Sequence, residues 1–263
     1  MKSEKIVMAV FTGTGNTLLM AKALAEELRN GGKDVSVAPV ERGNVPLPEG
    51  AALGLAVPVA CFSTYPSAWR FIDSLPDGGG REAFFIATMG GAGGGMEGPI
   101  RRVLELKGYK PLGALLVKMP GNYGNKIINT EENSKREKDG REAVKQFARR
   151  LSDGSANWSY GKPILSKFTA RLAHGRKPWN FFYGMFPIAV DPERCAGCGL
   201  CQKLCPEQNI RMDGGKSAIG ERCESCQRCV AFCPSGAISV PGKPSVQYRA
   251  VGIESMLSFL GIH

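Results

Sequence analysis

The sequence predicts an α/β unit on a doubly wound parallel sheet of five strands, followed by a small α+β unit that is rich in cysteine. Two observations lead to this prediction. Over residues 1–155, short apolar runs alternate with stretches of helical periodicity, which is the pattern of a parallel sheet covered by helices on both faces. Eight of the nine cysteines then lie between Cys195 and Cys233, so the second unit is organised around thiols.

Five short runs are apolar enough for strands that are buried on one or both faces. The predicted strands are residues 5–11, 34–40, 51–59, 83–89 and 112–119. The predicted helices are residues 18–29, 68–75, 99–106 and 141–151, and the polar stretch 125–140 is expected to be a solvent loop or a helix start. Right-handed crossovers bring the loops that follow the strands to one edge of the sheet. We therefore expect three loops to meet there: residues 12–17, 60–66 and 90–98.

The first of these loops has the composition of a phosphate site. Backbone N–H groups at a helix start point toward an anion, and the helix dipole favours negative charge there. The residues of this loop would add hydroxyl donors, one amide and two glycines that let the backbone curl: Thr12, Gly13, Thr14, Gly15, Asn16 and Thr17. No Gly-Lys-Ser/Thr closes the loop, so a monophosphate is favoured over a triphosphate. The alternative is a threonine-capped helix that binds nothing.

The loop Thr12–Thr17 resembles the Thr/Ser-x-Thr-Gly-x-Thr loop of flavodoxins, and every position of that pattern matches. The similarity extends over about residues 1–152 and implies the flavodoxin-like fold with bound FMN. Flavodoxins hold the flavin ring between two later loops. Tyr65 is the stacking candidate here, although a tyrosine at this place is also typical of simple packing.

The loop 90–98 contains glycines and no aromatic residue, which departs from the flavodoxin habit of covering both ring faces with aromatics. Gly91 and Gly93 would let backbone amides reach the ring, or would leave one flavin edge open. Residues 93–98 also fit the pattern GxGxxG. A dinucleotide site there is disfavoured, because no acidic residue follows at the distance where a ribose ligand is expected.

The cysteines form two copies of the spacing Cys-x-x-Cys-x-x-Cys-x-x-x-Cys-Pro. In this pattern three thiolates hold one iron–sulfur cubane and the fourth, before the proline, reaches the neighbouring cluster. One predicted [4Fe–4S] cluster is therefore held by Cys195, Cys198, Cys201 and Cys233. The other is held by Cys223, Cys226, Cys229 and Cys205. Structural zinc prefers separated Cys-x-x-Cys pairs, and disulfide frameworks belong to small secreted chains, so both alternatives are disfavoured.

The segment 188–242 resembles bacterial two-cluster ferredoxins, and all eight ligand positions match. We expect outer strands at 188–190 and 237–240 and a hairpin at 209–219. The whole chain resembles the flavodoxin–ferredoxin fusions, a family found among the redox proteins of anaerobes. That resemblance implies electron transfer between FMN and the two clusters within one chain. A flavin-dependent reductase of a small acceptor, with the clusters as electron inlet, is the alternative.

Two further segments complete the predicted organisation. Residues 156–187 contain eight of the 21 aromatic residues, five Lys or Arg and no acidic residue. A linker that packs the units together is favoured over a basic patch for a membrane surface or a partner. Residues 243–263 are a tail, in which 253–260 is expected to form a helix that docks on either unit.

The net charge of +10 favours acidic partners, but the pattern contains no recognised nucleic-acid module. The apolar start is too short for a signal peptide, and no run reaches the length of a membrane span. Cys61 is the one cysteine outside the cluster motifs, which fits a reducing compartment. We expect a cytoplasmic protein that exchanges electrons with a redox partner protein or a small acceptor. The sequence contains no signal for its oligomeric state.

Overall fold

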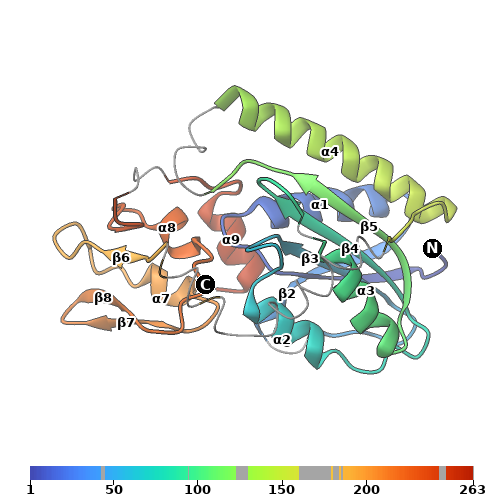
Figure 1. Ribbon diagram of the computed structural model, residues 1–263, viewed down its shortest axis with the longest axis horizontal. Coiled ribbons are helices and arrows are strands. Elements are labelled where there is room, and N and C mark those ends of the chain that lie inside the picture. The colour runs from blue at the N-terminus through green and yellow to red at the C-terminus, as the bar shows by residue number, and fades with distance from the viewer. Residues whose placement is uncertain are drawn as a thin grey trace.

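The computed structural model describes residues 1–42, 45–93, 95–122, 130–159, 179, 184, 186–242 and 247–262. An α/β unit and a cysteine-rich unit lie side by side in it (Figure 1). The predicted region 156–187 falls largely outside the described residues. Within the described ranges, none of the helices combines the length and the hydropathy that a bilayer-spanning segment needs.

The α/β unit is a parallel sheet of five strands in the order β2-β1-β3-β4-β5, which is the flavodoxin-like order. The strands are β1 (Lys5–Val10), β2 (Asp34–Pro39), β3 (Ala52–Pro58), β4 (Glu82–Met89) and β5 (Lys110–Lys118). The helices of this unit are α1 (Asn16–Asn30), α2 (Pro66–Ser74), α3 (Glu97–Leu106) and α4 (Thr130–Asp153), and a single 3-10 turn, η1 (Val40–Arg42), follows β2. The predicted five-stranded parallel sheet is confirmed.

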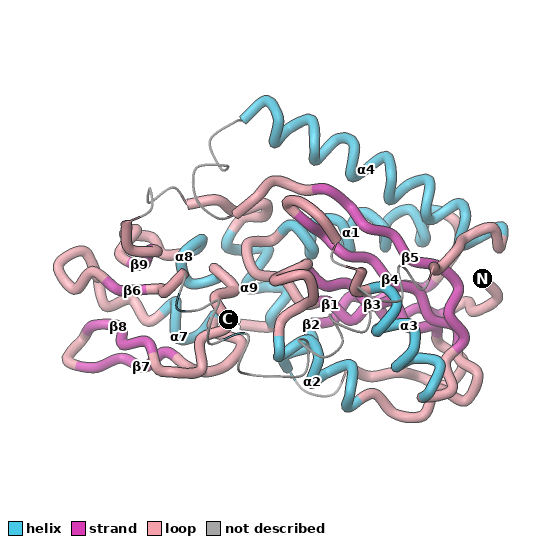
Figure 2. Tube along the Cα trace, in the orientation of Figure 1, coloured by secondary structure: helices cyan, strands magenta, loops and turns pink. Residues whose placement is uncertain are grey.

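Helices cover both faces of the sheet (Figures 1 and 2). On one face α1 and α4 bury residues such as Leu24 and Phe147 against the strands. On the other face α2 and α3 bury residues such as Trp69 and Ile100. The sheet therefore has two apolar layers, and the strands between them are almost fully apolar because neither face reaches water.

Helix α4 is longer than the predicted 141–151, because it begins at Thr130. Its first half is polar, and ion pairs one turn apart join Glu132 to Arg136 and Glu137 to Arg141. Such pairs stabilise a helix whose outer face carries no apolar stripe. Gly140 lets α4 lie close to β5, since a Cβ at this position would lie 2.9 Å from the Val117 side chain. The helical pattern of this half was hidden by its polarity.

The cysteine-rich unit repeats one backbone design twice. Its elements are β6 (Ala189–Val190), α7 (Leu200–Leu204), β7 (Ile210–Asp213), β8 (Lys216–Ile219), α8 (Arg228–Phe232) and β9 (Ile238–Ser239). Strands β6 and β9 pair antiparallel, as do β7 and β8. The helices α7 and α8 end at Cys205 and Cys233 with nearly the same dihedral angles, φ −69° and −68°. The expected outer strands and hairpin are present, whereas the two five-residue helices were not predicted.

The C-terminal helix α9 (Ile253–Leu260) packs on both units rather than on one. Met256 and Leu260 share an apolar cluster with Leu18 of α1 and with Leu204 and Phe232 of the cysteine-rich unit. The predicted tail thus contributes to the contact between the units.

Candidate functional site

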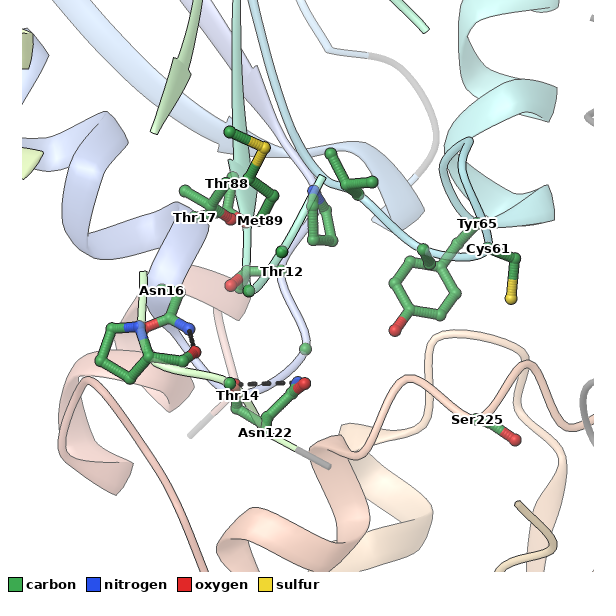
Figure 3. Close-up of a pocket in the computed structure, with 18 of the residues that line it drawn as sticks. Thr12, Thr14, Asn16, Thr17, Cys61, Tyr65, Thr88, Met89, Asn122 and Ser225 are labelled. Atoms are coloured by element: carbon green, nitrogen blue, oxygen red, sulfur yellow. Dashed lines mark hydrogen bonds between the residues drawn. The ribbon is translucent and has the colours of Figure 1, made fainter. Parts of the chain in front are cut away.

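A cavity of about 640 Å³ opens at the carboxyl edge of the sheet, where the predicted loops meet. Its walls include five residues of the first loop: Thr12, Gly13, Thr14, Asn16 and Thr17. Figure 3 shows Thr12, Thr14 and Asn16 on one side of this cavity and Tyr65 and Cys61 on the other. Crossover topology therefore assembles the site from loops that are distant in the sequence.

The first loop leads into the N-terminus of α1. Gly15 precedes the helix with φ 103°, and no side chain at that position caps the helix. The nearest substitute is a long hydrogen bond of 3.4 Å from Leu18 N to Thr12 Oγ1. The three threonines of the loop are buried. Uncapped N–H groups beside buried hydroxyls form an environment that suits an anion.

Two side chains of the loop are oriented by distant partners. The amide nitrogen of Asn16 donates to the Pro120 carbonyl at 2.9 Å, and the Asn16 oxygen accepts from the Tyr248 hydroxyl at 2.6 Å. Asn122 donates to Thr14 Oγ1 at 3.3 Å. Burial raises the pKa of Tyr248, so this hydroxyl keeps its proton and acts as donor. Asn16 is therefore held in place by a residue of the C-terminal tail.

The second loop brings aromatic residues to the cavity. Tyr65 is buried, and its ring centroid lies 5.2 Å from those of Phe11 and Trp179. Tyr65 and Trp179 both line the cavity. Cys61 also lines it, and burial raises the pKa of this thiol to about 12, so it stays neutral. Stacking of Tyr65 on a flavin remains a prediction.

The glycines of the predicted site are not equivalent. Gly91 lines the cavity, whereas Gly15 and Gly93 do not. A Cβ at Gly93 would lie 2.1 Å from the Leu116 side chain, so this glycine allows its loop to pack on β5. Gly90 and Gly91 are exposed and bring no side chain of their own to this wall, where Arg136 donates to the Gly90 carbonyl at 3.2 Å. Direct contact of Gly93 with a ring is not indicated by this placement.

The cysteine-rich unit also lines the cavity, which the sequence did not indicate. Phe186 and Ser225 belong to the cavity wall, and Ser225 Oγ donates to the Phe186 carbonyl at 3.3 Å. Ser225 lies between the predicted ligands Cys223 and Cys226. No local signal could have placed Ser225 in this wall, since the loop Thr12–Thr17 on the same cavity is more than 200 residues away along the chain.

The nine cysteines are all free thiols. Four of them line one small cavity together with both apolar and charged residues: Cys205, Cys223, Cys226 and Cys229. The thiol of Cys201, by contrast, interacts electrostatically with the thiols of Cys198 and Cys233. The fourth cysteine of each motif thus lies beside the triplet of the other, which is the arrangement that crossed ligation requires.

The surroundings of the thiols suit iron–sulfur ligation. Backbone N–H groups approach sulfur at Cys205 (3.3 Å, from Asn209) and at Cys223 (3.4 Å, from Ser225). Burial raises the pKa of the Cys226 and Cys229 thiols. A thiol in such a place gives up its proton when it binds a metal. N–H···S hydrogen bonds then compensate the thiolate charge.

The two candidate sites touch. A Cβ added to Gly13 would lie 2.1 Å from the carbonyl oxygen of Cys226, so the first loop packs directly on the cysteine loop. Beside this contact, the carboxylate of Glu224 accepts hydrogen bonds from Ser67 N (2.9 Å) and Ser67 Oγ (2.6 Å) at the start of α2. The cysteine-rich unit therefore supplies the cap for a helix of the α/β unit.

Comparison with known proteins gives one family match and several fold neighbours. Residues 187–234 match the family model "4Fe-4S dicluster domain". None of the curated proteins compared with the chain matches it. The sheet is similar to oxidised flavodoxin 2 from Bacillus cereus (15% identity, 57% of this chain and 98% of that chain, TM-score 0.42). It is also similar to a flavodoxin from the domain Archaea (16% identity, 56% and 99%, TM-score 0.41).

A third similar structure is rubredoxin oxygen:oxidoreductase from the anaerobe Desulfovibrio gigas, with 15% identity over 59% of this chain and 38% of that chain, and a TM-score of 0.39. The strand order β2-β1-β3-β4-β5 itself defines the fold of the first unit. The chain thus joins an α/β unit of the flavodoxin-like fold to a 4Fe-4S dicluster domain.

Proposed function

We propose that the chain is an electron-transfer protein that passes electrons between FMN, two [4Fe–4S] clusters and an external redox partner. The observation that carries this proposal is the contact between Gly13 and the Cys226 carbonyl. It puts the predicted phosphate loop against the predicted cluster loop. Two electron carriers held on either side of one van der Waals contact are positioned for direct exchange.

The cavity fits FMN by its chemistry. The N-terminus of α1 and the buried threonines would hold the phosphate. The aromatic side of the cavity, with Tyr65 as stacking residue, would receive the flat ring. Bound FMN would supply redox chemistry in which two electrons are accepted or released one at a time. Gly91 would bring its backbone close to the opposite edge of the ring.

The thiols fit two clusters, and the two sets of cysteines lie at different places relative to the α/β unit. We call the predicted site of Cys205, Cys223, Cys226 and Cys229 the proximal cluster site, because its loop contacts the flavin cavity. The predicted site of Cys195, Cys198, Cys201 and Cys233 is the distal cluster site. Bound clusters would supply single-electron transfer at each site.

The position of each site supports an order of transfer. Each set has two buried cysteines, but the distal set contains the one exposed cysteine, Cys198, whereas the other two of the proximal set, Cys205 and Cys223, are half-buried. An external redox protein can therefore approach the distal cluster more closely than the proximal one. We propose the order flavin, proximal cluster, distal cluster and partner, in either direction. Joining the carriers on one chain raises their effective concentration.

Cofactor content and transfer kinetics test this proposal. Anaerobically reconstituted protein should contain eight irons and one FMN per chain, as expected for two four-iron clusters and one phosphate loop. After rapid reduction, transfer between flavin and clusters should proceed at a rate that does not depend on protein concentration. Protein that takes up no FMN on reconstitution, or transfer that slows on dilution, would contradict the proposal.

The exposed wall at Gly90 and Gly91 supports a second candidate, a flavin-dependent reductase of a small acceptor. That wall would leave room for a substrate beside the ring. Steady anaerobic turnover of a small acceptor without any added protein would favour the reductase. Turnover that begins only when a redox protein is added would favour the electron carrier.

A further inference from the structure

Arg228 is an arginine buried between the two units. It directly precedes Cys229 in the second cysteine triplet, and its residue is 1% exposed. Arginine is almost never buried to this extent unless its charge and its donors are paired. Its partners therefore show what the residue holds together.

The guanidinium of Arg228 bonds to both predicted cofactor loops. Its Nε and Nη2 atoms donate to the Thr12 carbonyl at 3.1 and 2.5 Å, at the start of the phosphate loop. Its Nη1 atom donates to the Leu204 carbonyl at 3.0 Å, directly before the proximal ligand Cys205. One rigid planar group thus joins backbone of the phosphate loop to backbone of the proximal cluster site.

The charge of Arg228 is balanced from the α/β unit. Glu41, in the turn after β2, forms an ion pair with Nη2 at 2.6 Å, and its side chain is also buried. The Phe11 ring lies 5.6 Å from the guanidinium carbon. Separation of the units would take from this cation its counter-ion and the Thr12 carbonyl, and would leave it only the Leu204 carbonyl of its own unit. Such a loss is costly in a protein interior.

The first cysteine triplet contains no equivalent of this residue. Cys198 and Cys201 correspond to Cys226 and Cys229, so the position of Arg228 is occupied by Leu200 in the distal site. Leucine offers neither donors nor charge. The bond to the phosphate loop is therefore a property of the proximal site, although the cysteine spacing is the same in both.

We propose that Arg228 is a positioning residue that couples the two sites, so that FMN binding and assembly of the proximal cluster strengthen one another. This inference rests on the proposed function. Each cofactor orders its own loop, and Arg228 with the Gly13–Cys226 contact transmits that order to the other loop. The second cofactor to bind then meets a site that is already ordered, which gives positive coupling. Thermodynamic linkage makes the effect reciprocal.

Wild-type protein provides the first test. FMN is removed anaerobically from the full chain, and its rebinding is followed by quenching of FMN fluorescence, with the clusters present or after their removal by chelation. The FMN dissociation constant should rise about tenfold or more when the clusters are absent. In the reciprocal measurement, FMN should slow the release of iron to a chelator. Equal dissociation constants, together with iron release that ignores FMN, would overturn the proposal.

The variant Arg228→Lys provides the second test, since lysine keeps the charge but replaces by a single nitrogen the planar group whose three nitrogens bond to Thr12 and Leu204. It should weaken FMN binding about tenfold and abolish the protection of cluster iron by FMN. Arg222→Lys is the matched control, because Arg222 is an exposed arginine of the same unit. It should match wild type in both measurements. Folded Arg228→Lys protein with wild-type FMN affinity and protection would also overturn the proposal.

The outcomes separate this inference from the proposed function. Wild-type protein that binds no FMN removes both. Wild-type protein that binds FMN and eight irons, with neither affecting the other, removes the coupling and leaves the electron carrier intact. Because the wild-type arm needs no substitution, misfolding of Arg228→Lys would not prevent a decision.

Discussion

The proximal and distal cluster sites have the same cysteine spacing and different surroundings. The left-handed turns of the distal triplet use Gly197 and Gly199, with φ 68° and 69°. At the same places the proximal triplet has Ser225 and Gln227, with φ 53° and 64°. A side chain in this conformation costs roughly 1 kcal/mol or more. In the proximal loop this cost falls where Ser225 lines the cavity at the carboxyl edge of the sheet and where Gln227 is buried.

The two sites therefore differ in how they pack against the α/β unit, and not in their cysteine spacing. The proximal loop contacts the phosphate loop, to which its Arg228 donates, and the start of α2. The distal loop instead exposes Cys198. Four variants and two matched controls test this comparison, beginning with the greatest expected loss.

Removal of the crossed ligands should have the largest effect. Cys205→Ala should lose about four of the eight predicted irons, because this cysteine lies beside Cys223 and is predicted to complete that triplet and not its own. The flavin should then no longer exchange electrons rapidly with the remaining cluster. Iron analysis and anaerobic stopped-flow spectroscopy measure the two losses.

Cys233→Ala is the matched variant for the distal site. It should also lose about four irons, but flavin and proximal cluster should still exchange electrons rapidly, while delivery to an external partner slows. If Cys205→Ala instead emptied the site of Cys195 and Cys201, crossed ligation would be wrong.

The next largest effect is expected for Gly13→Ala. The new methyl group would lie 2.1 Å from the Cys226 carbonyl, so one of the two loops must move. Overpacking of this kind costs about 1–3 kcal/mol of unfolding free energy. FMN affinity should fall with it. Chemical denaturation and FMN titration measure both quantities.

Gly91→Ala is the control for steric crowding in the same cavity. Its Cβ would meet nothing within 4 Å, so the free energy of unfolding should stay within about 0.5 kcal/mol of wild type. Equal stability of the two alanine variants would show that the contact between Gly13 and Cys226 is not tight.

A smaller effect is expected for Tyr248→Phe, which removes the hydrogen bond to Asn16. A hydrogen bond of this kind contributes about 0.5–1.5 kcal/mol. FMN binding should weaken by the corresponding factor, about three- to tenfold, because Asn16 is no longer held from both sides. Iron content should not change. Unaltered FMN affinity would mean that the C-terminal tail does not support the phosphate loop.

The smallest effect is expected for Glu82→Gln, at the edge of the sheet that faces away from both clusters. Partial burial tends to raise the pKa of Glu82, but hydrogen bonds from Ser3 and Lys2 outweigh it and hold the pKa below 4.5. The carboxylate therefore stabilises the fold above that pH, and this contribution is lost as the pH falls through the lowered pKa.

At pH 7 the variant should be less stable than wild type by about 1 kcal/mol or less, and the difference should shrink as the pH falls through the lowered pKa of Glu82. Both cofactor sites should behave as in wild type. Denaturation curves at several pH values check the trend. A difference that grows on acidification would contradict this role for Glu82.

Much of the fold was visible in local patterns. The strands follow apolar runs, whereas the first half of α4 was left open between a loop and a helix start because polar residues joined by ion pairs show no apolar stripe. The predictions of a phosphate loop and of two cysteine sets also rest on spacing alone. Such features can be predicted because the residues that make them are neighbours along the chain or recur at a fixed spacing.

The tertiary structure decided how the two sites relate. Arg228, Tyr248 and Ser225 carry no signal in the sequence, where each reads as an ordinary polar residue. Their partners lie far away along the chain, such as Thr12 for Arg228 and Asn16 for Tyr248. Burial gives these groups their importance, because an unpaired polar group in an interior is expensive whereas the same group in water is not. Spacing therefore predicted the two cysteine sets, and packing determined which of them lies beside the cavity at the carboxyl edge of the sheet.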